Sequence, residues 1–451
     1  MHGKVGTGPT LPHAFVLFVA FGRVRKCLSV RFTVVQRIFA GEAGTRRLNT
    51  IALVVLGAVL LFTVLKGQVT RPHEWALTEL HLNYRYGLVR RGLVGELLEV
   101  VHRGKPPVGV FDVDMIFATV VLITWLTVLV RELRARLRVV SPEKTVAAMR
   151  LMGLFVFVSS PVIWNLAMCF GYLDPLFFVA GLLVVACRPG RVLHVVLALL
   201  LVLLAMFIHE MSGLLLGPLL LFFAFDPTAP WGVSRRNAAI VLPALAGLAV
   251  STLLLARCTP SPALEQQMLT RAWTSPEWVH MLCELLRVKV SPDLRATWAD
   301  AHVLARFRAN AVLCLPASIA LMVTGFCRLG GARITRRAKM LGALLLAVAS
   351  CSQLVTNLVA FDATRLFALT NMQAFLALSM LDRRLEGVPS GLGKYTMAWL
   401  MPFTGAIAVA GLLTRGQFTY LPVMWRLVPG GFDPVLWDPL TRLGRAVGTF
   451  F

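Results

Sequence analysis

An ionisable pair in the middle of a long apolar stretch constrains this chain more than any other feature. Residues 195–208 are apolar almost without break, His209 and Glu210 follow, and residues 211–225 are mostly apolar again. A charge at the centre of a bilayer costs roughly 2.5–3.5 kcal/mol on insertion scales. The pair is therefore expected either at a membrane interface, where one helix turns into the next, or beside a hydrated cavity lined by protein. Both settings indicate a functional site, with a plain hairpin cap as the alternative.

Apolar runs elsewhere in the chain predict a membrane protein. Hydrophobic residues make up 57% of the 451 residues, and the mean hydropathy is +0.74. Soluble domains are about half apolar and do not carry many long uncharged runs. The runs have the length of membrane-spanning helices and lack the strand alternation of outer-membrane barrels. We therefore expect an all-α fold, a polytopic transmembrane helical bundle.

Short basic turns between the apolar runs predict the topology. The turns around Arg188, Arg235 and Arg336 are expected in the cytoplasm under the positive-inside rule. With the N-terminus inside, this alternation gives about eleven spans and a C-terminus outside. The expected spans cover residues 50–65, 115–130, 151–170, 175–187, the two runs on either side of 209–210, 238–255, 311–327, 341–360, a run that ends at 381, and 395–413.

The same pattern divides the chain into three regions. We expect a cytoplasmic or interfacial N-terminal segment, a transmembrane domain with two long extracytoplasmic loops, and an extracytoplasmic tail. Their residues are 1–48 for the segment, 49–414 for the domain, 66–114 and 257–308 for the loops, and 415–451 for the tail. The first loop has the leucine spacing of an amphipathic helix beside the membrane, and the second has three tryptophans that suit an interfacial, partly helical cap.

The net charge and the spacing of the cysteines limit which binding partners and which cysteine chemistry we expect. The net charge of +23 comes largely from Lys and Arg between apolar runs, where they set topology and contact anionic headgroups. Membrane lipid is therefore an expected partner and nucleic acid is not. None of the eight cysteines forms a C-x-x-C metal motif. Cys258 and Cys283 share one loop, where a disulfide would persist if the loop is extracytoplasmic, with two free thiols as the alternative.

The predicted topology brings several charged side chains to the extracytoplasmic face. Glu210 is a candidate general base or metal ligand, and His209 would orient it or share its proton. A divalent metal held by these two and Asp174 stays open. The candidate catalytic residues are Glu210, His209, Asp174 and Asp362. The candidate phosphate-binding residues, chosen for the forked donor that arginine offers to phosphate, are Arg90, Arg91 and Arg365.

Each candidate also has a structural interpretation. Asp174 and Asp362 are candidate helix N-caps, Arg365 is one turn from Asp362 and suited to pair with it, and Arg90 and Arg91 are suited to contact headgroups. Taken together, bases and phosphate-binding arginines at lipid level favour a lipid-linked phosphate or pyrophosphate sugar as substrate. We expect a glycosyltransferase or glycan polymerase. The alternatives are a transporter or flippase for a lipid-linked or anionic substrate, and a non-catalytic component of an envelope assembly complex.

Four short motifs carry a resemblance to a known group of proteins. They are the segments 84–95, 171–174, 208–210 and 362–365. In them the chain resembles uncharacterised bacterial polytopic membrane proteins that are similar in layout to envelope-polysaccharide polymerases and GT-C class glycosyltransferases. The resemblance implies the bacterial inner membrane, a lipid-linked sugar substrate, and envelope-biosynthesis partners. GT-C enzymes usually place a catalytic Asp in the first external loop, whereas before Asp112 this loop offers only Glu74, Glu79, Glu96 and Glu99.

Overall fold

The computed structural model describes most of the chain between residues 74 and 414. The described ranges are 74–103, 144–163, 173–188, 190–271, 275–287, 301–359, 363–391 and 394–414, with isolated residues of 50–58 and 120–131. The chain divides into two compact units, Met1–Ala58 and Val59–Phe451. All the elements below belong to the second unit. The predicted segment 1–48 and tail 415–451 lie outside the described residues.

Throughout the described ranges the regular secondary structure is helical, which confirms the all-α prediction. The only β-type pairings there are two isolated bridges, Phe225 with Val233 and Ala332 with Ser390. The helices are α3 (Glu74–Glu79), α4 (Leu93–Val101), α6 (Lys144–Ser159), α8 (Asp174–Ala186), α9 (Val192–Ile208), α10 (Ser212–Ala224), α11 (Arg235–Leu255), α12 (Pro262–Arg271), α13 (Pro276–Arg287), α15 (Ala301–Gly331), α16 (Arg336–Val359), α17 (Ala363–Arg384) and α18 (Lys394–Thr414).

Two of the described helical segments are long and apolar enough to cross a membrane, by length and composition alone. They are Arg235–Leu255 and Asn310–Gly331, and five shorter apolar helices accompany them. This supports a membrane protein, while eleven spans and the positions of the termini stay predictions. The bounds of the expected span at 151–170 differ from the structure, in which α6 begins at Lys144 and ends at Ser159, while residues 164–170 lie outside the described residues. Pro161 follows, and a proline disfavours helical conformation in the residue before it.

Exposed leucines mark the outer surface of the bundle. On α9, Leu193, Leu197, Leu200 and Leu204 are all exposed, and their spacing places them on one side of the helix. Opposite them, residues such as Val195 and Val202 are fully buried. A continuous apolar face of this kind is a liability in water but suits contact with lipid chains. The pattern agrees with the membrane setting expected from the sequence.

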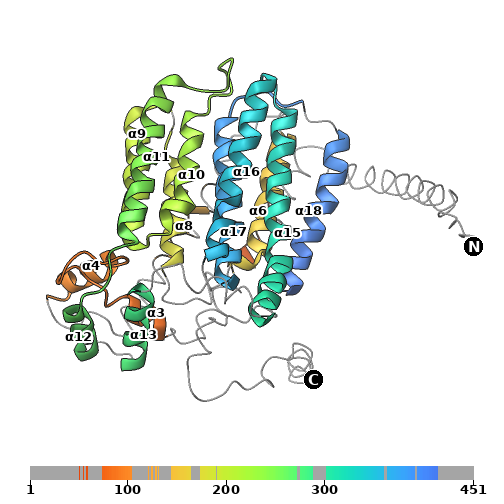
Figure 1. Cartoon of the computed structure of the whole chain (residues 1–451). Coiled ribbons are helices and arrows are strands. Elements are labelled where there is room, and N and C mark those ends of the chain that lie inside the picture. Colours follow the sequence, from red (N-terminus) through yellow and green to blue (C-terminus); the bar gives the residue numbers. More distant parts are fainter. Residues whose placement is uncertain are drawn as a thin grey trace, which may run out of the picture. The chain divides into compact units, whose positions relative to one another are not determined.

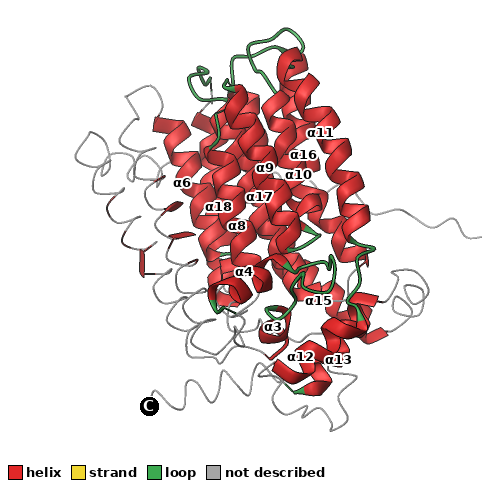
Figure 2. Cartoon of the chain, turned by 90° about the vertical axis from the view of Figure 1, so that its left-hand side faces the viewer, coloured by secondary structure: helices red, strands yellow, loops and turns green. Residues whose placement is uncertain are grey.

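The long helices pack beside one another in Figures 1 and 2, and α15 and α16 both pack along α17. Aromatic side chains fill part of the core. The rings of Phe157 on α6 and Phe375 on α17 stack with centroids 4.1 Å apart, and Phe178 on α8 lies 5.3 Å from Phe157. The core therefore joins helices that are far apart in the sequence.

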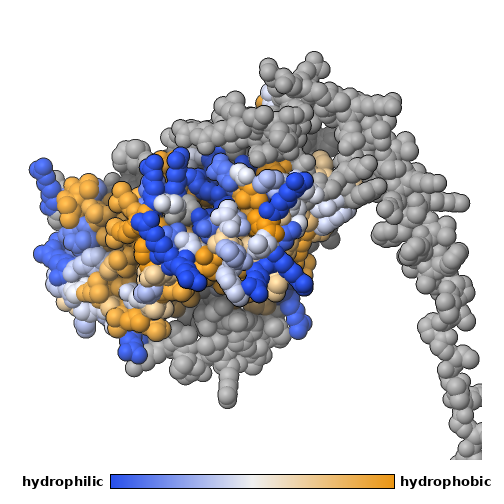
Figure 3. All heavy atoms as spheres, turned by 90° about the horizontal axis from the view of Figure 1, so that it is seen from above, coloured by the Kyte–Doolittle hydropathy of each residue, from blue (hydrophilic) through white to orange (hydrophobic). Residues whose placement is uncertain are grey.

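The turns at one end of the bundle are rich in arginine, and several of these side chains hold helix ends. Figure 3 looks onto this end, where hydrophilic residues gather next to hydrophobic ones. Arg383 donates to the carbonyl oxygen of Ala186 at the end of α8, at 3.0 Å, and Arg384 donates to that of Phe223 near the end of α10, at 3.2 Å. Cations suit helix C-termini because the last carbonyls carry partial negative charge. We call this the basic end.

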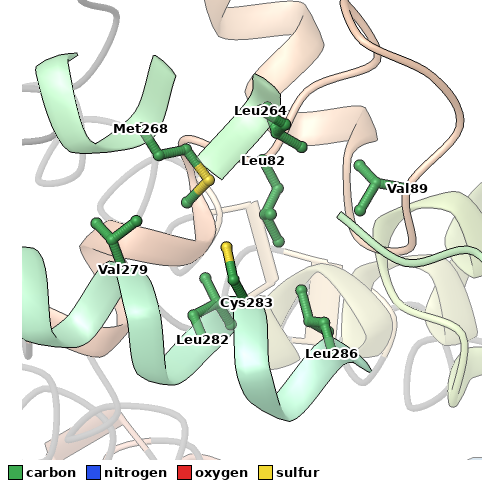
Figure 4. Packing of buried hydrophobic residues seen from close by; sticks show 8 residues of the cluster. All are labelled: Leu82, Val89, Leu264, Met268, Val279, Leu282, Cys283 and Leu286. Atoms are coloured by element: carbon green, nitrogen blue, oxygen red, sulfur yellow. The ribbon is translucent and has the colours of Figure 1, made fainter. Parts of the chain in front are cut away.

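Four short helices form a cap at the opposite end, and Figures 1 and 2 both show α3, α4, α12 and α13 there. The partly helical nature of loop 257–308 is thereby confirmed. The cap has an apolar core of its own, shown in Figure 4. Its buried members are Leu82, Val89, Leu264, Met268, Val279, Leu282, Cys283 and Leu286.

Candidate functional site

The candidate site lies where the cap meets the turn between α9 and α10. The hydroxyl of Tyr84, in the loop between α3 and α4, donates to the carbonyl oxygen of Phe207 on α9 at 3.4 Å. Charged side chains from both segments meet beside this contact. We call these residues, Glu79, Arg90, Arg91, His209 and Glu210, the junction network.

Arg91 is the centre of the junction network because two carboxylates hold its guanidinium. Its Nε and Nη2 donate to Oε2 and Oε1 of Glu210 at 3.2 and 3.1 Å. Its Nη1 donates to Oε1 of Glu79 at 2.7 Å. Glu79 and Glu210 are only 2% and 6% exposed. A two-pronged bond of this kind is the strong, geometrically specific form of an Arg–carboxylate pair.

Arg90 has a different role from its neighbour. Its Nη2 donates to the carbonyl oxygens of Leu285 and Leu286 at 3.2 and 2.5 Å, so it holds the last turn of α13. Its Nη1 also lies 3.8 Å from Oε1 of Glu210. Arg90 therefore ties the cap to the α9–α10 turn, while its buried Nε has no hydrogen-bond partner in the described part of the chain.

The backbone around Arg91 explains how two adjacent arginines reach different partners. Arg91 has φ of +67°, in the left-handed region that non-glycine residues rarely adopt. Gly95 then lets α4 pass under the preceding loop, since a Cβ there would lie 2.0 Å from the carbonyl oxygen of Leu82. The motif at 84–95 thus builds a tight loop that directs Arg90 toward α13 and Arg91 toward Glu210.

His209 shapes the turn between α9 and α10. Its Nδ1 accepts a hydrogen bond from the backbone N–H of Met211 at 3.2 Å, and the same nitrogen lies 3.3 Å from Oε2 of Glu210. One ring nitrogen cannot serve both partners at once. The neutral ring accepts from Met211, which leaves its proton on Nε2, whereas a doubly protonated ring has an Nδ1–H to offer Glu210. His209 therefore caps the hairpin and is also placed to share a proton with Glu210.

Charge in the junction network is balanced. Burial opposes ionisation of Glu210, but Arg91, His209 and Arg90 outweigh it and hold the pKa of that carboxyl well below its usual range. The two arginines and the two glutamates cancel in formal charge. A carboxylate with a strongly lowered pKa is a weak base. In the arrangement seen here, Glu210 positions Arg91 better than it would accept a proton.

Of the other predicted site residues, the structure describes Asp174 but neither Asp362 nor the side chain of Arg365. Asp174 lies in the first turn of α8 and is 2% exposed. It is not the N-cap, because that position is Leu173. One turn further, the ring of Phe177 meets the His209 ring edge-on at 5.5 Å, so the start of α8 lies beside the α9–α10 turn. Asp362 and the side chain of Arg365 lie outside the described residues, although the backbone of Arg365 belongs to α17.

The metal interpretation finds no geometric basis. Among the described residues no three His, Cys, Asp or Glu side chains form a group that could hold a metal ion, so Asp174, His209 and Glu210 do not make a ligand set.

The predicted disulfide between Cys258 and Cys283 is not formed in the structure. Cys283 is fully buried in the cap core, where burial raises the pKa of its thiol to about 11. Cys258 is half-buried and donates to the carbonyl oxygen of Leu254 at 3.4 Å, so the free-thiol alternative is the one the structure shows.

Glu79 is the member of the junction network that the sequence did not single out. It is one of four glutamates in its loop, and only the fold separates them. Glu96 accepts from the backbone N–H of Tyr84 at 2.9 Å, and Glu99 pairs with Arg271 at 2.9 Å. Both therefore stabilise the cap. Gly213 marks a close approach of two helices, because a Cβ there would lie 2.4 Å from Thr252 Oγ1 on α11.

Comparisons with known proteins add no family to this description. No protein-family model matches the chain. No curated protein and no solved structure matches it either. The resemblance to envelope-polysaccharide polymerases and GT-C enzymes therefore stays a prediction from the four motifs.

Proposed function

We propose that this chain is a multi-pass membrane protein of the bacterial inner membrane that binds a lipid-linked phosphate sugar at its capped, extracytoplasmic end and transfers the sugar, as a glycosyltransferase or glycan polymerase. The observation that carries the proposal is the forked guanidinium of Arg91, buried between two carboxylates where the cap meets the bundle. The lipid chain would remain beside the apolar helices, and the phosphate would meet the arginine.

Phosphate binding at Arg91 requires an exchange of partners. A phosphate, like a carboxylate, offers two acceptor oxygens to the forked guanidinium, so it would compete with Glu79 or Glu210 for Arg91. Displacing Glu210 would remove its strongest favourable charge, which would raise its pKa and restore its capacity as a base. Substrate binding would then also activate the carboxylate that accepts the proton.

The proposed transfer is a displacement at the anomeric carbon of the sugar. The acceptor hydroxyl oxygen forms the new bond to that carbon, the bond from the carbon to the phosphate oxygen breaks, and the phosphate leaves with the electron pair. The proton of the acceptor hydroxyl passes to a carboxylate, for which Glu210, Asp174 and Asp362 are the candidates. His209, 3.3 Å from Glu210, would share that proton.

Lipid binding in nanodiscs tests the proposal. The protein should retain a polyprenyl phosphate but not the uncharged polyprenol, as measured by native mass spectrometry. Arg91→Lys should weaken retention because lysine lacks the planar fork. Glu79→Gln should strengthen it, because one competing carboxylate is lost. Arg271→Lys, which alters an arginine paired within the cap, is the matched control and should bind as the wild type does. Equal retention of both lipids by every variant would contradict the proposal.

A transporter or flippase is the second candidate. One observation favours it: several neutral polar side chains are buried inside the bundle, between α15, α16 and α17. Transporters bind their substrates between helices, near the middle of the membrane. Movement of a fluorescent lipid-linked phosphate across vesicles that contain the protein, without sugar transfer, would favour this candidate over the enzyme.

A further inference from the structure

Neutral polar side chains gather in the core of the bundle, away from the junction network. Three helices supply them, and all are at most 4% exposed. We call this group the polar belt. Its members are Ser318 on α15, Ser350 and Gln353 on α16, and Thr370, Asn371 and Gln373 on α17. Every member is an amide or a hydroxyl, so the polar belt carries no charge.

The helix register brings these residues to one level. A short connection joins the end of α16 to the start of α17, and the two helices pack antiparallel. Residues at matching distances from the connection therefore lie at similar heights on the two helices, as Ser350 and Gln373 do, and likewise Gln353 and Thr370. The third helix joins at the same level, because Ser318 Oγ donates to Asn371 Oδ1 at 2.6 Å.

Several atoms of the polar belt have no hydrogen-bond partner within the described part of the chain. They are both amide atoms of Gln373, the Nδ2 of Asn371 and the Oγ of Ser350. Buried polar groups are nearly always hydrogen-bonded, because burying one without a partner costs free energy. Three such residues at one level therefore indicate a ligand or water molecules that complete the hydrogen bonds.

The unmet hydrogen bonds identify the chemistry of that ligand. Gln373 Nε2 and Asn371 Nδ2 are donors, whereas Gln373 Oε1 is an acceptor. A cation would satisfy only the acceptors, and an anion would satisfy only the donors. A hydroxyl group both donates and accepts, and it brings no charge into the bundle. We propose that the polar belt binds a neutral, hydroxyl-rich group, such as a sugar, between α15, α16 and α17. This site is independent of phosphate binding at the junction network.

Cysteine accessibility tests the proposal in the full-length protein. The variant Ser318→Cys places a thiol in the polar belt, and native Cys314, one turn away on α15, is its matched control. Cys314 is fully buried in an apolar cluster with Phe367. A small water-soluble methanethiosulfonate should modify the introduced thiol roughly tenfold faster than it modifies Cys314, because thiol reactivity follows access. Ser350→Cys provides a second position if the first variant does not fold.

Sugar protection then identifies the ligand. Free glucose, galactose or mannose in one arm, or a polyprenyl-phosphate mannose in nanodiscs in the other, should slow the modification, and the arm that does so gives the source of the sugar. Adding Gln373→Met should abolish this protection, because both an unmet donor and an unmet acceptor are removed. Equal and slow labelling of both thiols in folded protein would overturn the site. If the introduced thiol is labelled quickly but no sugar slows the reaction, the polar belt does not bind a sugar and water occupies it.

Discussion

The junction network and the polar belt are both buried and both polar, yet they differ in what completes them. In the junction network, Arg91 is held by two carboxylates, and the positive and negative charges cancel. In the polar belt, neither amide atom of Gln373 has a partner among the residues that the structure describes. A buried charge cannot stay without a counter-charge, whereas a buried amide can wait for water or a ligand at a smaller cost. The guanidinium of Arg91 is thus fully engaged in the free protein, whereas the amide of Gln373 remains ready to bind.

The junction network should lose the most stability when one of its carboxylates is removed. Glu210→Gln removes one carboxylate from Arg91 and leaves positive charge uncompensated at a buried site. Removing one partner of a buried pair typically costs about 3–5 kcal/mol, so the thermal unfolding temperature in detergent should fall sharply. Glu284→Gln is the control, because Glu284 is largely exposed and pairs with Arg287 on the same helix. An unchanged unfolding temperature in Glu210→Gln would mean that the junction network does not hold the cap.

The same substitution also concerns the chemical role of Glu210. Loss of activity in Glu210→Gln does not separate a catalytic role from a positioning role if the folded protein is lost with it. Asp174→Asn and Asp362→Asn are therefore the informative companions. If either abolishes sugar transfer while folded protein stays at the wild-type level, that aspartate is the base, and Glu210 positions Arg91.

A pH titration examines a neutral buried group at the capped end. Burial lowers the pKa of His81 from 6.5 to about 4. Between these values the unfolded chain binds the proton and the folded chain does not, so stability falls as pH drops through 6.5 and the loss is complete below about 4. The full loss is about 3 kcal/mol. The pKa of Glu210 is lowered from 4.5, so its contribution is lost only below that value. Unfolding temperatures at pH 7.5 and 5 should differ in the wild type and converge in His81→Leu.

A substitution in the polar belt should change the unfolding temperature least, and in the opposite direction. Gln373→Met keeps the volume of the side chain and removes two polar atoms that lack partners among the described residues. Each such atom costs about 1–3 kcal/mol when buried, so the substitution should raise the unfolding temperature of the ligand-free protein modestly. Gln267→Met on α12 is the comparison in the cap. A clear drop in the unfolding temperature of Gln373→Met would show that the amide already has partners in solution.

The sequence was informative wherever charge met an apolar background. Because a charge beside lipid needs a partner, the sequence pattern alone singles out Glu210 and Arg91, and the two side chains do meet. It did not indicate Glu79, because its role depends on a loop that doubles back over α4. It also did not indicate Gln373 or Asn371. Neutral amides lower the hydropathy of a helix only slightly, and their importance emerges only when helix packing buries them, with Asn371 beside Ser318 and Gln373 without a partner among the described residues.

Under the predicted membrane topology, the arginines at the basic end have two roles. Arg383 and Arg384 hold the ends of α8 and α10 by their carbonyl oxygens. The positive charges expected to orient the chain during insertion therefore also form hydrogen bonds between neighbouring helices. If a helix inserted in the opposite orientation, its arginines would lie on the wrong side of the membrane, and the hydrogen bonds to neighbouring helix ends would be lost. Under that topology, an error of insertion would therefore also be an error of packing.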